Sequence, residues 1–577
     1  MRARGIWLAA AAVGALAAPA AASAHAYLVK TVPAQSQILH AAPRQVALTY
    51  DEAVEPRFAT ISVTDAKGRQ LATGTASRSP SNPDTLVVPL RPHLSRGWYL
   101  VYWRAISVDG HPVQGYYTFA IGPAPGAPPE FSVPHATQSA TTPDVIATRW
   151  LAFLSTMVAI GLFVLRIAIV RPLVRRVEGT ARSLRAVTGA FAVAAVTALV
   201  AVPLYLDTAT SVDTLRSAFD VGALVPLFRV TAFGRAWVDL ELCLALFCGA
   251  AAVALWLDRP ERGRRSIAEL LATSGALLAA AAVLLVPGLA GHAAQTAPRG
   301  VSLLLDWVHL ASGSLWLGGL LGLIVLAAAL PPELRVAGLS TCVPRFSNVA
   351  LASVALLLAS GIGATIVHLP LLAALWQTSY GVAILVKIGL LAAAAALGAV
   401  NLLRTKPQLV AARERVGLGD PAVTLLRRSI GAETVLVSGA VLAAAVLSSL
   451  APPPAALAEA SSNLATVGPG RVASVVHTNG YALQVLVSPN TVGTVDSFGL
   501  RISRNGRPVR GANVTLAFDM LAMAMGHLEY QLVETAPGLY TRRAPALVMA
   551  GRWSLEFSIA PKRGAPFSAL VIDHASG

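Results

Sequence analysis

The sequence predicts a multidomain membrane protein in which an all-β domain, an eight-helix transmembrane bundle and a second small β domain follow one another. Two observations support this fold class. Of the 577 residues, 55% are hydrophobic and only 13% are charged, and apolar runs long enough to cross a bilayer recur through the middle of the chain. Both ends of the chain instead alternate polar and apolar residues over short segments bounded by turn-forming residues, which is typical of strands.

The first 24 residues have the pattern of a secretory signal peptide. Two arginines precede an apolar stretch, which ends in a small-residue cleavage site at 22–24. Cleavage there leaves His25 as the first residue of the mature chain. Its free α-amine and its imidazole then supply two nitrogens that close one chelate ring on a metal, and such ligands suit Cu(II). The alternative is cleavage a few residues away, which leaves His25 as an ordinary exposed residue.

Both ends of the chain are predicted to fold as small β-sandwiches, a Greek-key one over 25–122 and another over 470–577. The segments 123–144 and 451–469, rich in small residues and proline, read as linkers. The chain has three cysteines, all in its apolar middle region, so neither β domain relies on disulfides. The clearest strand patterns lie at 45–50, 59–63, 98–103, 116–120, 482–487, 513–518 and 553–557.

The middle region, residues 145–450, is predicted to form eight transmembrane helices. Basic residues gather in the loops after helices one, three, five and seven, and the positive-inside rule makes these loops cytoplasmic. The even number of helices then places both β domains outside a bacterial cytoplasmic membrane, in the periplasm or beyond. The same loops explain the net charge of +16, so we exclude nucleic acid as a partner. The predicted helices span 146–170, 186–206, 233–257, 267–290, 302–330, 348–370, 381–402 and 431–450.

One motif in the first β domain carries metal-binding side chains. Asp109-Gly110-His111-Pro112 lies between two predicted strands, where a turn presents a carboxylate and an imidazole together. With His25 the motif offers three nitrogens and one oxygen, a set that suits Cu(II) in a tetragonal geometry. Taken alone, it reads as an ordinary Asp-Gly turn.

Several segments of this domain together look like the CopC family of periplasmic copper-binding β-sandwiches. The resemblance implies that His25 binds Cu(II) through its amine and ring, helped by Asp109 and His111. No methionine occurs between His25 and Arg149, so we expect Cu(II) alone, without the Met-rich Cu(I) loop of some family members. The matching segments are His25-Ala26-Tyr27-Leu28, Pro33-Ala34, Glu52-x-Val54-Glu55 and Asp109-Gly110-His111-Pro112-Val113-x-Gly115.

Five ionisable residues fall toward the outer half of the predicted bundle. His292 closes helix four, Asp306 and His309 open helix five, His368 ends helix six, and Lys387 lies in helix seven. Ionisable groups are costly inside a membrane, so we assign these five to a translocation path. Asp306 and His309 share a helix face, where the carboxylate orients the imidazole or joins it as a ligand. The alternative for His292 and His368 is a place in headgroup water.

Residues 145–450 resemble the CopD family of inner-membrane copper-resistance proteins, which implies a role in copper uptake. The resemblance rests on the eight helices and on three motifs, and it places this region after a CopC-like module, as in CopC/CopD fusions. The motifs are Gly291-His292-Ala293, Asp306-x-x-His309 and Trp316-x-Gly318-Gly319.

The last domain contains a group of methionines. Four of the six methionines lie in the last 58 residues, and Met520, Met523 and Met525 precede His527 closely. In a strand the side chains of 523, 525 and 527 point to one side, and thioethers with an imidazole suit Cu(I). The alternative is a methionine-lined core edge. The segment is similar to YtkA-like domains through Gly506-x-Pro508-Val509, Pro537-Gly538-x-Tyr540 and Gly551-x-Trp553.

Together these patterns predict a copper-handling protein that is not an enzyme. We expect it to capture periplasmic copper as Cu(II), to move copper across the cytoplasmic membrane in import, homeostasis or resistance, and to hold Cu(I) in its last domain. The expected partners are copper ions, the lipid bilayer, and periplasmic copper chaperones or cuproenzymes. The alternatives are a haem-binding membrane cupric reductase and a copper chaperone for oxidase assembly that does not transport. An oxygen-activating copper site at His25 is a further reading, which the Asp109 carboxylate opposes by filling a coordination position.

Overall fold

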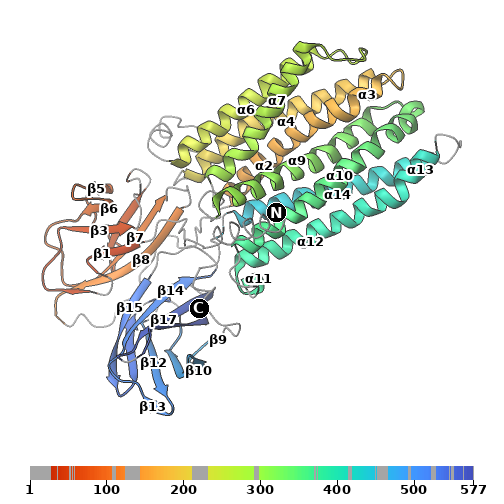
Figure 1. Ribbon diagram of the computed structural model, residues 1–577. Coiled ribbons are helices and arrows are strands. Elements are labelled where there is room, and N and C mark those ends of the chain that lie inside the picture. The colour runs from red at the N-terminus through yellow and green to blue at the C-terminus, as the bar shows by residue number, and fades with distance from the viewer. Residues whose placement is uncertain are drawn as a thin grey trace, which may run out of the picture. The chain divides into compact units, whose positions relative to one another are not determined.

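The computed structural model separates into a helical unit and a unit that contains two β domains (Figure 1). It describes residues 28–34, 37–50, 54, 56, 59–106, 112–123, 143–210, 232–290, 298–368, 372, 374–412, 419–448, 450, 465–491, 495–521, 528–544, 546–547, 551–562 and 564–575.

The first β domain is a sandwich of two four-stranded sheets, as the sequence predicts. One sheet has the order β1-β3-β6-β5 and the other β2-β8-β7-β4. Alternate residues of β3 and β7, among them Leu48 and Trp103, point into one hydrophobic core between the sheets. The strands are β1 (Leu28–Val32), β2 (Ile38–Leu39), β3 (Gln45–Tyr50), β4 (Thr60–Asp65), β5 (Ser77–Ser79), β6 (Asn82–Pro89), β7 (Gly97–Ile106) and β8 (Pro112–Ile121).

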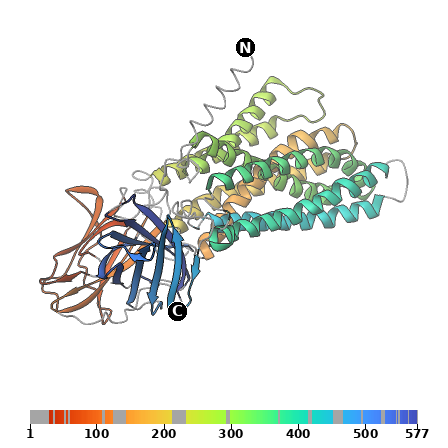
Figure 2. The same cartoon turned by 60° about the horizontal axis from the view of Figure 1, so that its bottom comes forward.

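The second β domain curls one antiparallel sheet almost closed, in the order β10-β11-β12-β16-β15-β14-β17-β18-β9 (Figure 2). Strand β9 pairs in parallel with β18, and β13 pairs with β12 at the side. A core that includes Phe498, Phe518 and Trp553 fills the curl. The strands are β9 (Ala465–Val467), β10 (Val472–Thr478), β11 (Tyr481–Ser488), β12 (Asp496–Arg504), β13 (Arg507–Pro508), β14 (Asn513–Met520), β15 (Leu528–Ala536), β16 (Leu539–Ala544), β17 (Gly551–Ala560) and β18 (Phe567–Ala575).

The helical unit contains, within the described ranges, eight helical stretches that are long and apolar enough to cross a membrane, which agrees with the predicted number. They lie alongside one another as a bundle (Figures 1 and 2). The helices of this unit are α2 (Pro143–Leu165), η2 (Arg166–Val170), α3 (Arg171–Val174), α4 (Ala181–Thr210), α6 (Ala232–Leu257), α7 (Ile267–Ala290), α9 (Arg299–Ala329), α10 (Pro332–His368), α12 (Ser379–Val400), η4 (Asn401–Thr405), α13 (Lys406–Ala411) and α14 (Gly419–Leu447). The short helix α11 (Ala374–Gln377) and the first four residues of α12 are grouped with the other unit.

Several helices are longer than their apolar runs indicated. Helix α10 begins at Pro332 rather than at 348, and α14 begins at Gly419 rather than at 431. Basic residues that the sequence analysis placed in loops, such as Arg345 and Arg427, are therefore helical. An apolar window ends where the membrane core ends, whereas backbone hydrogen bonding continues the helix beyond it.

Helices α2 and α9 pack backbone to backbone through two glycines. A Cβ atom on Gly161 would lie 2.0 Å from the Ser314 carbonyl oxygen, and one on Gly318 would lie 2.5 Å from Gly161 Cα. Small residues at a helix crossing allow this approach in membranes. Because α9 carries His309 and Trp316, the crossing fixes the position of the candidate site.

Candidate functional site

His309 lies where α9, α10 and α12 meet. Its Nδ1 is 3.1 Å from Ser360 Oγ on α10, and its Nε2 is 3.1 Å from Lys387 Nζ on α12. The sequence predicted both His309 and Lys387 for a membrane path, and the fold brings them into direct contact. Ser360 was not predicted, because a serine in an apolar helix carries no charge to mark it.

The hydrogen bonds assign the protons of the His309 ring. Ser360 Oγ lies 2.7 Å from the carbonyl oxygen of Leu356, so its single hydroxyl proton is donated there and Oγ accepts from His309 Nδ1–H. The Nε2 atom then carries a lone pair and accepts from the Lys387 ammonium. This lone pair is the one that a metal would use, so Lys387 occupies the metal-binding position of the ring.

Asp306 lies one turn before His309 on α9, close enough to act electrostatically on Lys387. Helix α9 begins at Arg299, so Asp306 and His309 lie two to three turns inside the helix rather than at its opening as predicted. Gly288 of α7 makes room for the carboxylate, since a Cβ atom there would lie 2.8 Å from Asp306 Oδ2. The site therefore combines an imidazole, an ammonium and a nearby carboxylate.

Two other residues were predicted for the path, His292 and His368. His292 lies outside the described residues. His368 is the last residue of α10, and its side chain is not among those described.

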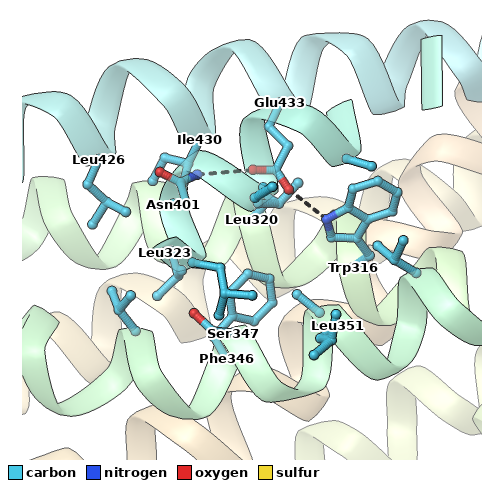
Figure 3. Close-up of a pocket in the computed structure, with 17 residues that line it drawn as sticks. Trp316, Leu320, Leu323, Phe346, Ser347, Leu351, Asn401, Leu426, Ile430 and Glu433 are labelled. Carbon is cyan, nitrogen blue, oxygen red and sulfur yellow. Dashed lines mark hydrogen bonds between the residues drawn. The ribbon is translucent and has the colours of Figure 1, made fainter. Parts of the chain in front are cut away.

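The sequence analysis missed a second buried polar group, Glu433 in the middle of α14. Its Oε1 accepts a hydrogen bond of 2.8 Å from Trp316 Nε1, and its Oε2 accepts one of 3.2 Å from Asn401 Nδ2, as Figure 3 shows. The Oδ1 of Asn401 in turn accepts from Ser429 and Thr405. A lone glutamate within an apolar helix was the signal that could have found this group.

A cavity of about 260 Å³ adjoins Glu433. Apolar side chains of α9, α10, α12 and α14 form most of its wall, and Asn401 begins the π-helical turn η4. Such turns occur often at functional sites. Figure 3 shows the Glu433 carboxylate on one side of the cavity and Phe346, Ser347 and Leu351 on the other.

The predicted copper ligands of the two β domains lie almost entirely outside the described residues. Ile106 of β7 pairs with Pro112 of β8, and Asp109, His111 and His25 lie outside the described residues. Met520 ends β14 and is 7% exposed in the core of the last domain. Met523, Met525 and His527 follow it outside the described ranges. Among the described residues no three His, Cys, Asp or Glu side chains gather around one point.

The last β domain buries an acidic pair. Asp496 and Asp573 are 0% exposed and are bridged by Asn490, whose backbone N–H donates to Asp496 and whose Nδ2 donates to Asp573. Their Oδ2 atoms accept no hydrogen bond within the described part of the chain. Burial raises the pKa of Asp573 to about 6, although the hydrogen bond from Asn490 acts in the opposite direction. Burial likewise raises the pKa of Asp496.

Four family models match the chain in succession. The CopC domain model matches residues 28–122, and the model of the copper resistance protein D-like N-terminal domain matches 140–301. The model of copper resistance protein D matches 340–447, and the YtkA-like model matches 477–558. All three resemblances found in the sequence are thereby confirmed.

Individual relatives agree with the family models. The copper transport protein CutJ of Bacillus subtilis (strain 168) is 28% identical over 544 residues, which cover 93% of each chain. Protein YobA of Escherichia coli (strain K12) is 38% identical over 98 residues, covering 17% of this chain and 79% of its own. The crystal structure of CopC from Methylosinus trichosporium OB3b is 30% identical and covers 19% of this chain and all of its own, with a TM-score of 0.16. The chain therefore joins CopC, copper resistance protein D and YtkA-like domains in one polypeptide.

Proposed function

We propose that this protein imports copper across the cytoplasmic membrane of a bacterium and that the His309 site is a station on the path. The contact between His309 and Lys387 carries the proposal, because an imidazole lone pair and a cation are brought together inside an apolar bundle. Such groups are costly in a membrane, so their presence there supports a functional role. The chain acts as a transporter in this proposal and catalyses no reaction.

Copper is first captured outside the membrane. The CopC domain holds Cu(II) through His25, Asp109 and His111, a nitrogen and oxygen set that suits this ion. The domain match to CopC supports this step. The signal peptide and the outward orientation of both β domains are part of the same proposal.

At the His309 site the copper ion replaces the Lys387 ammonium on Nε2. The ring itself does not need to turn, because the bond from Nδ1 to Ser360 already directs Nε2 toward the approaching ion. The displaced ammonium remains near Asp306, which acts on it electrostatically. The site therefore alternates between two cations rather than standing empty.

In the YtkA-like domain, Met523, Met525 and His527, which follow Met520 in the sequence, offer a Cu(I) site with it on the same side of the membrane. Thioethers favour the reduced ion. This domain holds copper that reaches it as Cu(I), and periplasmic copper chaperones or cuproenzymes exchange copper with it.

The test is the copper content of cells that express the wild type or His309→Ala, matched for protein abundance in the membrane. Exposed His93 provides the matched control as His93→Ala. We expect more cellular copper with the wild type and the control than with His309→Ala. Equal copper in all three strains would contradict import through this site and would favour a chaperone that holds copper outside. An optical spectrum of the purified protein with haem bands would favour a reductase instead.

A further inference from the structure

The helices that form the His309 site also line the cavity beside Glu433. On α9, Trp316 follows His309 by seven residues, which is close to two full turns and about 10 Å along the helix axis. The two side chains therefore lie on nearly the same face of α9, at different depths.

On the two neighbouring helices, the cavity-lining residues are displaced along the helix axis from the residues of the His309 site by similar distances. On α10 the cavity is lined by Val354, six residues before Ser360, and on α12 by Ala395, eight residues after Lys387. These steps correspond to about 9–12 Å of helix, in one direction for all three helices since α10 runs antiparallel to the other two. The cavity is thus the next space along the same three helices, and α14 adds Glu433 to it.

Glu433 is the only carboxylate among the described residues that line the cavity, and it is 3% exposed. Its hydrogen-bond partners Trp316 and Asn401 are both neutral. An ionised carboxylate taken out of water without a compensating cation is strongly disfavoured. The group therefore needs a positive partner during part of its working cycle.

Within the described ranges, no ion pair joins Glu433 to a fixed charge of the protein. Some charged groups of the surrounding elements have other partners: Arg149 of α2, for example, bonds to Tyr205 and Ser448. Others, such as Arg427 and Arg428 of α14, are exposed. Besides Glu433 itself, the charged or titratable residues on α14 and on the elements packed against it are Asp144, Arg149, Arg299, Asp306, His309, Glu333, Arg335, Cys342, Arg345, His368, Tyr380, Lys387, Arg404, Lys406, Asp420, Arg427 and Arg428.

The side chains around Glu433 suit the binding of a proton better than the binding of a copper ion. Trp316 and Asn401 present N–H groups to the carboxylate, and Asn401 Oδ1 already accepts two hydrogen bonds. No histidine, cysteine or methionine is among the described lining residues. Copper requires several nitrogen or sulfur ligands, whereas a proton requires a single carboxylate oxygen.

We propose that Glu433 is the proton-binding group of this transporter and that copper and a proton move in opposite directions. The inference rests on the proposed copper transport. The rise of about 10 Å along α9 from His309 to Trp316 sets the scale of the separation. At about that distance a unit positive charge changes the proton-binding equilibrium of a carboxylate by roughly tenfold at an effective dielectric constant of about 20. Copper that arrives from outside thus releases the proton from the carboxylate oxygen, and a proton binds again after copper has left toward the cytoplasm.

The test uses the full-length protein in liposomes that contain a pH-sensitive dye, with the membrane potential held at zero by potassium and valinomycin. Copper(II) chloride is added outside, with and without ascorbate, and copper entry and lumen pH are recorded together. For the wild type we expect the lumen to become more alkaline as copper enters. Glu433→Gln, which cannot carry the proton, should lower the protons moved per copper at least tenfold. Glu241→Gln, a substitution at another membrane carboxylate outside the cavity, should leave this ratio unchanged.

Different results overturn different statements. If the wild type admits no copper in either oxidation state, the proposed transport and the proton exchange both fail. If copper enters and Glu433→Gln moves as many protons per copper as the wild type, only the role of Glu433 fails. Should Glu433→Gln not fold, the wild type decides by itself: an acidic lumen must accelerate copper entry, and the absence of acceleration overturns the exchange.

Discussion

Glu433 in the helical bundle and Asp573 in the last β domain are both buried carboxylates that accept a hydrogen bond from an asparagine amide. Their surroundings differ. Glu433 adjoins a cavity of about 260 Å³, whereas Asp573 lies in a β domain near a second buried carboxylate, Asp496. The same chemical group thus adjoins space for an exchangeable cation in one place and a second acid in the other. We infer that Glu433 serves transport and that Asp573 serves stability.

The largest effect is expected from a substitution at the helix crossing that holds Trp316, the hydrogen-bond donor to Glu433. Gly318→Val places a side chain against the backbone of Gly161, which cannot move aside as a flexible side chain would, and costs about 3 kcal/mol or more. We expect loss of the folded membrane protein, measured as monodisperse protein after extraction in mild detergent. Gly275→Val is the control, because nothing lies within 4 Å of a Cβ atom there. Equal recovery of both variants would show that the α2–α9 crossing does not hold Trp316 in place.

The second prediction concerns Asp573, whose protonation makes the stability of the last β domain depend on pH. The folded-state pKa of about 6 lies above the ordinary value of 3.8, so the folded domain retains a proton that the unfolded chain loses. The retained proton therefore contributes about 3 kcal/mol to the free energy of unfolding of the last β domain. This contribution is complete below pH 3.8 and is lost as the pH rises through about 6. Hydrogen exchange of the β18 amides, corrected for the intrinsic rate, measures the change in this free energy with pH.

The variant Asp573→Asn is neutral at every pH, so the difference between pH 4 and pH 7 in β18 exchange should become much smaller. Copper entry should be unaffected in this variant. An unchanged pH profile would mean that the proton is held elsewhere, for instance on Asp496. A loss of copper entry would remove the distinction between the two carboxylates.

A third prediction compares the neutral donors. Trp316→Phe removes the N–H that binds Glu433, and Asn490→Ala removes the amide that binds Asp573. Each leaves a buried oxygen without its donor, at a cost of about 2 kcal/mol. Chemical denaturation of the full-length protein, followed by hydrogen exchange in α9 and in β18, measures the two losses separately. Only Trp316→Phe should also alter the protons moved per copper. Equal transport defects in both variants would contradict the assignment of transport to Glu433 and of stability to Asp573.

The smallest effect concerns the charged partner of His309, in contrast to the neutral partners of Glu433. Lys387→Met frees the Nε2 lone pair, and copper affinity at this site should rise about tenfold, because a hydrogen bond from a charged group no longer competes. Copper titration in a His111→Ala background, which removes a proposed ligand of the outer Cu(II) site, measures the change. Lys406→Met at the start of α13 serves as control. An unchanged affinity would argue against copper binding at His309.

Most of the architecture was readable from local patterns. The strands at β3 and β14 begin where the alternation begins, and eight apolar runs became eight spanning helices. Helix ends were predicted poorly, because hydropathy measures the membrane core and not the backbone hydrogen bonds that extend α10 and α14 beyond it.

The sequence by itself determined the order of the domains, their family and the residues that stand out chemically, such as His309 and Lys387, because periodicity and rare ionisable residues are properties of a linear chain. Only the tertiary structure decided which of these residues meet. The contact of His309 with Lys387 joins residues 78 positions apart, and that of Trp316 with Glu433 joins residues 117 apart. Such pairs depend on how helices cross, and those crossings follow from close packing at glycines whose partners the linear sequence does not specify.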